Sequence, residues 1–205
     1  MTEKFTVYLV DDDPGVLKAL SRLLRAKGHD VKPYSSPQVF LEEHDVAVPG
    51  CVVLDVSMPG LDGLEIQRVL TAASGYHRPV VFVTGKGDIP TSVRAMKAGA
   101  IDFLTKPVKD KDLFEAVSRA EARDAESRRL HSELESMQAK VSNLTPRERE
   151  VFTHVVAGRL NKQIAGDLGT VEKTIKVHRS RMMEKLGIRM VADLVRMAEK
   201  LNLSK

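Results

Sequence analysis

Residues 8–15 read YLVDDDPG and place three consecutive aspartates directly after an apolar run. Three adjacent carboxylates repel one another, so this arrangement requires either open solvent or a bound cation. The apolar run is the first of five short, largely β-branched runs, and stretches with helical periodicity separate them. The runs lie at residues 5–10, 30–35, 50–56, 79–85 and 100–106. Their alternation with helices predicts an α/β domain of the flavodoxin-like, doubly wound kind with five parallel strands.

In such a sheet, ligands bind beyond the carboxyl ends of the strands. Asp11 and Asp12 follow the first predicted strand, Asp55 and Thr84 lie at the ends of the third and fourth, and Lys106 follows the fifth. Carboxylates suit Mg²⁺, which takes oxygen ligands and leaves room for a phosphate. An ammonium and a hydroxyl beside them are groups that stabilise a phosphoryl group in transfer. We therefore expect Asp11, Asp12 and Asp55 to hold Mg²⁺ and Asp55 to become an aspartyl phosphate.

Charge and composition narrow the class of protein. Residues 1–122 hold 15 Lys and Arg against 17 Asp and Glu, residues 123–143 hold 4 against 4, and residues 144–205 hold 13 against 7. The positive C-terminal part favours a nucleic-acid contact there. The apolar runs are too short to span a membrane, which predicts a cytoplasmic protein without membrane partners. The single Cys51 is expected to be buried, and the six histidines lack the spacing of a zinc site.

Residues from about 110 to 142 have an unbroken helical pattern. Leu130, Leu134, Met137 and Val141 recur in it at spacings of four, three and four. Such a seam is long enough for a short coiled coil, but a solvated helical linker fits it equally well. We take residues 123–143 as the linker between a first domain at 1–122 and a second at 144–205.

The second domain is expected to be all helical. Thr145, Pro146 and Glu148 form a capping box with proline at the first helical position. Three further helices are predicted at about 161–168, 172–185 and 190–201, separated by glycines. The domain is therefore predicted to consist of four helices.

Four segments of the first domain, VDDD, LDVSMPGLDG, VTGKGD and FLTKP, resemble the receiver domain of two-component response regulators. The resemblance covers about residues 3–122. It implies that a sensor histidine kinase phosphorylates Asp55 and that the backbone carbonyl of Ser57 also binds the Mg²⁺. It further implies that Thr84 and Phe103 act as switch residues and that the bond before Pro107 is cis. Asp13, the third aspartate, is expected to cap the first helix.

The segment from LTPRE to KLGI resembles the helix-turn-helix domain of the LuxR, NarL and FixJ class. The resemblance implies a scaffold helix at 161–168 and a recognition helix at about 172–186. Val171 stands where the family has a capping residue, so the recognition helix either starts at Thr170 or lacks a side-chain cap; Leu160 replaces the usual serine. The DNA-binding residues that the resemblance implies are Asn161, Lys162, Lys173, Thr174, Lys176, Val177, His178, Ser180 and Arg181.

Together the two resemblances imply a transcription regulator that phosphorylation converts to a dimer, or releases, to bind two-fold related DNA half-sites and act with RNA polymerase. The dimer contacts expected from them are Val93, Met96, Lys97, Val191, Leu194 and Val195. The segments TGKGDIP and DFLTKP are most similar to FixJ-type activators of nitrogen fixation, whose kinase is FixL, although NodW- and StyR-type regulators share much of the pattern.

Two other classes of protein share parts of this pattern. A phosphohydrolase with an aspartyl nucleophile would place a second aspartate two positions after Asp55, where Ser57 stands. The other alternative is a DNA-binding protein whose receiver only dimerises, without phosphorylation, but the full set of acidic and switch residues favours a working receiver. We expect no enzymatic activity beyond Mg²⁺-dependent self-phosphorylation and slow autodephosphorylation.

Overall fold

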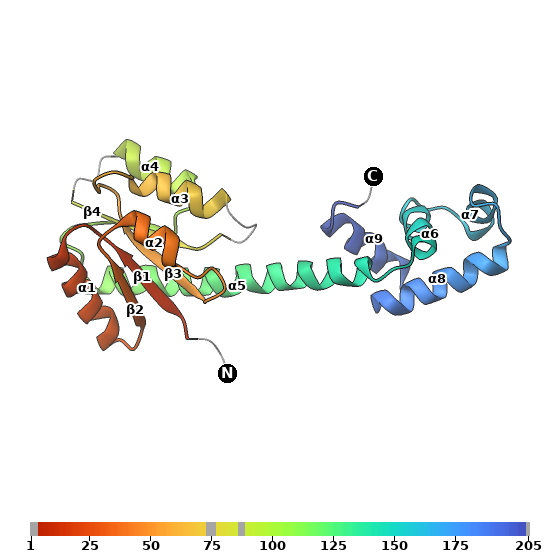
Figure 1. Ribbon diagram of the computed structural model, residues 1–205, viewed down its shortest axis with the longest axis horizontal. Helices are drawn as coiled ribbons and strands as arrows, with labels where there is room; N and C mark the ends of the chain where they lie inside the picture. Colours follow the sequence, from red (N-terminus) through yellow and green to blue (C-terminus); the bar gives the residue numbers. More distant parts are fainter. Residues whose placement is uncertain (1–3, 73–76, 86–88, 204–205) are drawn as a thin grey trace. The chain divides into compact units, whose positions relative to one another are not determined.

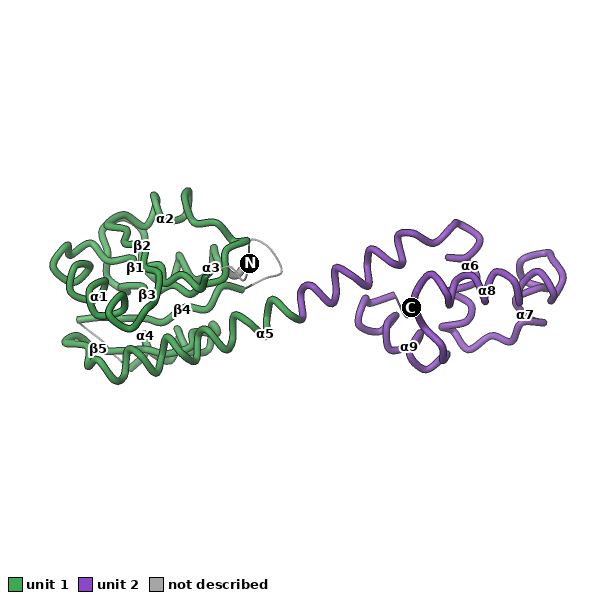
Figure 2. The backbone as a smooth tube through the Cα atoms, turned by 90° about the horizontal axis from the view of Figure 1, so that it is seen from below, with its two compact units in different colours: residues 1–129 green, residues 130–205 purple. Residues whose placement is uncertain are grey.

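The computed structural model of the protein describes residues 4–72, 77–85 and 89–203. The chain divides into two compact units, residues 1–129 and 130–205, which Figure 2 draws in green and purple. Each unit has its own hydrophobic core. The boundary between the units falls within one helix, α5 (Asp110–Ser142).

Five parallel strands form the centre of the first unit (Figure 1). In the spatial order β2-β1-β3-β4-β5 they are β2 (Asp30–Tyr34), β1 (Thr6–Val10), β3 (Gly50–Asp55), β4 (Val80–Thr84) and β5 (Asp102–Thr105). β1, β3 and β4 are buried along their whole length, as expected for strands with helices on both faces. The predicted doubly wound sheet is confirmed. The last strand is shorter than the predicted 100–106, because the N–H of Ala100 bonds the carbonyl of Ala95 at the end of α4.

Helices cover both faces of this sheet. One core joins α1 (Pro14–Ala26) and the first part of α5 to the strands, through Leu24 and Leu113 among others. The other core joins α2 (Pro37–Glu43), α3 (Gly63–Ala72) and α4 (Ile89–Lys97) to the opposite face. The two cores exist because successive strand residues point to opposite faces of the sheet.

Arg128, near the end of the part of α5 that belongs to the first unit, bonds this helix to the loop before β3. The Arg128 guanidinium donates to the carbonyls of Val46, Ala47 and Val48, each at 2.8 Å, and to the Asp124 carboxylate at 3.0 Å. Asp124 is itself buried. A planar group with five donors is suited to such a set of acceptors. The loop before β3 is therefore fixed to α5.

The second unit contains the end of α5 and the helices α6 (Pro146–Val156), α7 (Asn161–Asp167), α8 (Glu172–Leu186) and α9 (Val191–Lys200). The predicted capping box is confirmed: the Thr145 hydroxyl accepts from the Glu148 N–H at 3.3 Å, and the Glu148 carboxylate accepts from the Thr145 N–H at 2.9 Å. α8 ends at Gly187, whose φ of 70° a glycine adopts without strain. Among the described residues, the structure contains no helix with the length and apolarity to cross a membrane.

Candidate functional site

The carboxyl ends of β1 and β3 bring the predicted acidic residues together. β1 and β3 pair in register, with Val10 opposite Leu54, so the residues that follow, Asp11 and Asp55, lie side by side. Ligand atoms of Asp11, Asp12 and Asp55 all lie within 4.8 Å of one another. Asp11 and Asp55 are 4% and 6% exposed, whereas Asp12 is open to solvent. This set of oxygen donors fits Mg²⁺, with the exposed side left for water or a phosphoryl group.

Lys106 links the two buried carboxylates. Its Nζ donates to Asp11 at 2.7 Å and to Asp55 at 3.1 Å. Burial raises the pKa of Asp11, although the hydrogen bonds from Lys106 and from the Asp13 backbone oppose that rise. Burial alone would lower the pKa of Lys106, but its bonds to the two carboxylates outweigh burial and raise it. The ammonium is therefore charged and neutralises part of the acidic site.

The third aspartate has the role expected for it. The Asp13 carboxylate accepts from the N–H groups of Gly15 at 2.7 Å and Val16 at 3.3 Å, which caps α1. The three consecutive aspartates thus serve three purposes: Asp11 is buried beside Lys106, Asp12 offers an exposed carboxylate, and Asp13 starts a helix.

The predicted switch residues come from β4, which pairs with β3, and from β5, the edge strand beyond it. Thr84 ends β4 and is fully buried. Phe103, on β5, is half-buried and packs against Phe82, with 6.1 Å between the ring centroids. The N–H of Ser57 donates to Asp55 at 3.3 Å. The Lys106–Pro107 peptide bond is cis, as the family resemblance implied.

One residue that the sequence analysis did not single out also shapes this site. A Cβ on Gly63 would lie 2.5 Å from the backbone oxygen of Asp55. The Gly63 N–H donates to the carbonyl of Val56 at 3.0 Å, which holds the start of α3 against the end of β3. The only signal for this in the sequence was the glycine that ends the motif LDVSMPGLDG.

The predicted DNA-binding residues lie on α7 and α8. Asn161 and Lys162 are the first two residues of α7, and the other predicted residues lie on α8. Those exposed to solvent are Lys162, Lys173, Lys176, Val177, Ser180 and Arg181; those partly buried are Asn161, Thr174 and His178. Arg179, which lies among them on α8, donates to the Asn161 side chain at 2.9 Å and so joins the two helices. This bond uses one of the two lone pairs of the Asn161 side-chain oxygen.

Neither helix of the predicted helix-turn-helix has a side-chain cap at its first turn. Val171 precedes α8 and makes no capping bond, which confirms the second of the two options for this helix. Leu160 precedes α7 and likewise makes no side-chain capping bond. Its backbone N–H donates to the side-chain oxygen of Gln163 at 2.9 Å. Leu160 and Val171 are 67% and 65% exposed.

The residues expected to form dimer contacts have different environments. On α4, Val93 and Met96 are about half-exposed and Lys97 is exposed, beside Ile89, which is 80% exposed. On α9, Leu194 is fully buried in the core of the second unit, so the expectation that it contacts a partner is wrong. Its side chain serves the fold. Val191 packs against the same core, and Val195 is half-buried.

The apolar residues of the predicted linker also differ in burial. Met137 and Val141 pack against the core of the second unit, while Leu130 is 43% exposed. Half of the apolar seam is therefore covered within the chain itself.

The fold and the two sites define a class of protein. Residues 7–118 match the family described as response regulator receiver domain, and residues 142–198 match bacterial regulatory proteins of the luxR family. The chain belongs to the response regulators with a LuxR-type DNA-binding domain and is a transcriptional regulator.

Relatives of the whole chain lead to the same class. Nodulation protein W of Bradyrhizobium diazoefficiens is 41% identical over 98% of this chain and 88% of its own length. The response regulator protein TmoT of Ectopseudomonas mendocina is 42% identical over 97% and 90%, and the transcriptional regulatory protein FixJ of Azorhizobium caulinodans 40% over 97% and 93%. The solved structure of the response regulator StyR is 45% identical over 96% of this chain and 99% of its own, with a TM-score of 0.81.

Proposed function

We propose that this regulator is switched by phosphorylation of Asp55. The observation that carries the proposal is the contact of Lys106 with both Asp11 and Asp55, at the edge of the sheet where the acidic oxygens gather. A carboxylate oxygen of Asp55 attacks phosphorus in the phosphohistidine of a sensor kinase. The new O–P bond forms as the P–N bond breaks, and the imidazole leaves.

Each residue of the site has a part in this step. Asp11, Asp12, Asp55 and the backbone carbonyl of Ser57 are the ligands we assign to Mg²⁺, which when bound neutralises charge on the phosphoryl oxygens. Lys106 supplies a second positive charge 3.1 Å from Asp55. We assign to this chain no other chemistry than self-phosphorylation from small phosphodonors and slow autodephosphorylation.

The phosphoryl group then biases the receiver between two states. Thr84 and Phe103 move towards it, and the exposed face of α4 that carries Val93, Met96 and Lys97 changes its packing. Two copies pair through this face, or the second unit is released. Val191 and Val195 contribute to pairing of the second units. Two recognition helices then bind half-sites related by two-fold symmetry, and the complex acts on RNA polymerase. Such a regulator works in the cytoplasm.

Self-phosphorylation tests the site. The protein is incubated with acetyl phosphate and Mg²⁺, and acyl phosphate is measured by mass spectrometry. We expect modification of the wild type and of Asp13→Asn, because asparagine still caps α1, and none of Asp55→Asn. Asp12→Asn should be modified at least tenfold more slowly. If Asp13→Asn loses as much activity as Asp12→Asn, the division of roles among the three aspartates is wrong.

The mass of the phosphorylated protein by light scattering tests pairing. We expect a shift from monomer to dimer that Met96→Glu abolishes. Val39→Glu is the matched control, because Val39 is similarly exposed but lies on α2. A phosphorylated protein of unchanged mass would favour release of the second unit. A dimer that forms without phosphorylation would support a receiver used only for dimerisation.

The DNA contact and the signal need their own tests. Selection from a random duplex pool should yield a two-fold related site, and Arg181→Met should weaken binding and reduce the salt slope by about one.

The finer proposal is a FixJ-type activator of nitrogen-fixation genes with a FixL-like kinase. It predicts phosphotransfer from such a kinase faster than from kinases of other systems. The similarity to TmoT and to nodulation protein W makes this comparison necessary.

A further inference from the structure

The segment from α1 to β2 concentrates positive charge on a domain that is acidic as a whole. Residues 14–35 contain five Lys and Arg and one acidic residue, Asp30, whereas residues 1–122 contain 15 and 17. The Asp30 carboxylate accepts from the hydroxyl of Thr6 at 3.4 Å. The local excess of positive charge attracts anions to this edge of the sheet.

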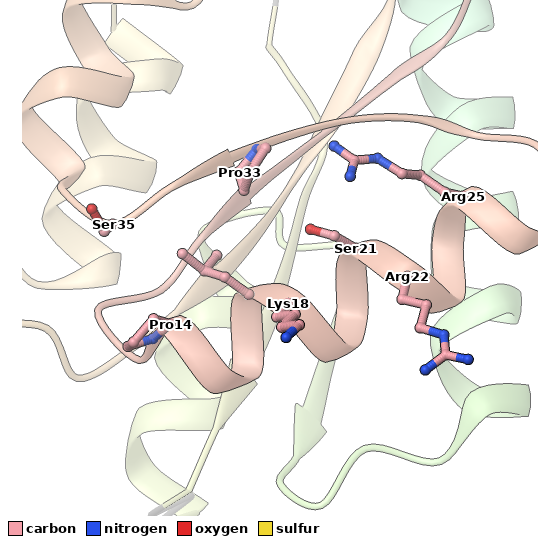
Figure 3. Close-up of a pocket in the computed structure, with 8 residues that line it drawn as sticks. Pro14, Lys18, Ser21, Arg22, Arg25, Pro33 and Ser35 are labelled. Carbon is pink, nitrogen blue, oxygen red and sulfur yellow. The ribbon is translucent and has the colours of Figure 1, made fainter.

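A groove of about 670 Å³ lies between α1 and the edge strand β2 (Figure 3). This volume is in the range of small-molecule pockets, and the walls combine apolar and polar groups as such pockets do. The residues that line it are Pro14, Leu17, Lys18, Ser21, Arg22, Arg25, Pro33 and Ser35. Among these described lining residues, none is acidic.

Most of the donors around the groove are not used within the described part of the protein. Figure 3 shows Arg25 reaching from α1 towards β2, while Arg22 extends away from the strand. One Nη atom of Arg25 donates to the carbonyl of Val31 at 2.9 Å, which orients the guanidinium beside the groove. Lys18 and Arg22 form no ion pair with any residue that the structure describes.

Ser21 gives an independent indication of a ligand. The residue is 5% exposed, and its hydroxyl has no hydrogen-bond partner in the described part of the chain. In Figure 3 the hydroxyl points from α1 into the space below β2. Buried polar groups in folded proteins nearly always have a partner. An acceptor at the floor of the groove would provide one.

We propose that the groove between α1 and β2 binds a small organic phosphate. Lys18, Ser21 and Arg25 donate to the phosphate oxygens, and the apolar part of the ligand lies against Leu17 and Pro33. An ammonium, a guanidinium and a hydroxyl match the several oxygens of a phosphate better than the two of a carboxylate. The site is separate from Asp55 and does not depend on the function proposed above.

Nuclear magnetic resonance of the ¹⁵N-labelled full chain tests this site. The titrations use ADP, pyrophosphate and adenosine, in EDTA so that no divalent cation can carry phosphate to the acidic site. We expect ADP to shift the amide signals of residues 14–35 in a saturable way, pyrophosphate to bind these residues about tenfold more weakly, and adenosine not to bind. Arg25→Gln, Lys18→Met and Ser21→Ala should each raise the Kd for ADP, the first two by about tenfold.

Lys27→Met is the matched control, since Lys27 belongs to the same charged segment but does not line the groove. It should change the Kd by less than about twofold. An equal effect of Lys27→Met and Arg25→Gln would show general attraction of anions and overturn the proposal. So would shifts of residues 14–35 by duplex DNA but not by ADP. If Arg25→Gln does not fold, Lys18→Met and Ser21→Ala still decide.

Discussion

Glu148 should make the stability of the second unit depend on acid pH. Its carboxylate is 3% exposed and accepts from Lys185 Nζ at 2.6 Å and from the Thr145 N–H at 2.9 Å. The hydrogen bond from Lys185 is the main reason that the pKa of Glu148 falls from 4.5 to about 2. Because folding lowers this pKa, the stabilisation is fully present above pH 4.5 and is lost as the pH falls towards 2.

The size of this effect follows from the two pKa values. A difference between 4.5 and about 2 corresponds to roughly 3 kcal/mol, at about 1.4 kcal/mol per pKa unit. The Lys185 side chain is 39% exposed, so water and salt screen part of the interaction. We therefore expect about 1.5 kcal/mol of the free energy of unfolding to depend on Glu148 ionisation.

Methionine oxidation at increasing urea concentration can measure the free energy of unfolding of each unit in the intact protein. Oxidation of a buried methionine requires opening of the core that surrounds it. Met182, fully buried, reports on the second unit, and Met58, 8% exposed, reports on the first. We compare wild type with Glu148→Gln between pH 5.5 and pH 2.5. Glutamine keeps an acceptor for the Thr145 N–H but has no charge to lose.

The result expected is a larger loss of stability at Met182 in the wild type than in Glu148→Gln, by about 1.5 kcal/mol. Lys185→Met, like Glu148→Gln, should lose less stability at Met182 than the wild type between pH 5.5 and pH 2.5. The stability reported by Met58 should change equally with pH in all three proteins. Equal pH dependence at Met182 in wild type and Glu148→Gln would refute the reasoning.

Three further predictions concern the first unit. Gly63→Ala should destabilise it by at least about 2 kcal/mol, seen as earlier oxidation in urea, because the new Cβ would lie 2.5 Å from the Asp55 backbone oxygen. Arg128→Met should increase hydrogen exchange in the loop at residues 46–48 by about tenfold or more, since three carbonyls lose their donor. Cys51 should resist alkylation at pH 8 until the unit unfolds, because burial raises the pKa of its thiol.

Each of these has a control and a contradicting outcome. Gly85→Ala places a Cβ where nothing lies within 4 Å, so it should be mild; a Gly63→Ala protein as stable as Gly85→Ala would show that α3 moves aside freely. Arg129→Met removes two hydrogen bonds to the Glu126 carboxylate on the helix surface and should leave exchange of the loop unchanged. Alkylation of Cys51 in the folded protein at the rate of an exposed thiol would contradict its burial.

The local and periodic features of this protein could be predicted from its sequence. Runs of β-branched residues separated by helical periods determine a parallel sheet, and parallel strands bring their carboxyl ends to one edge. That is why Asp11, Asp55 and Lys106 could be placed together although they are up to 95 positions apart. The caps at Asp13 and Thr145 involve only residues two or three positions away, so they too could be predicted.

Tertiary structure alone decided which neighbour covers each face. Periodicity marks Leu194 and Met137 as lying on apolar faces, but the core of the second unit, rather than a partner chain, covers them. The ion pair of Glu148 with Lys185 and the clamp of Arg128 on the loop before β3 join residues whose spacing carries no local signal. The burial of Ser21 beside a basic groove has the same origin. A sequence pattern states which face must be buried, whereas the packing of distant elements determines what buries it.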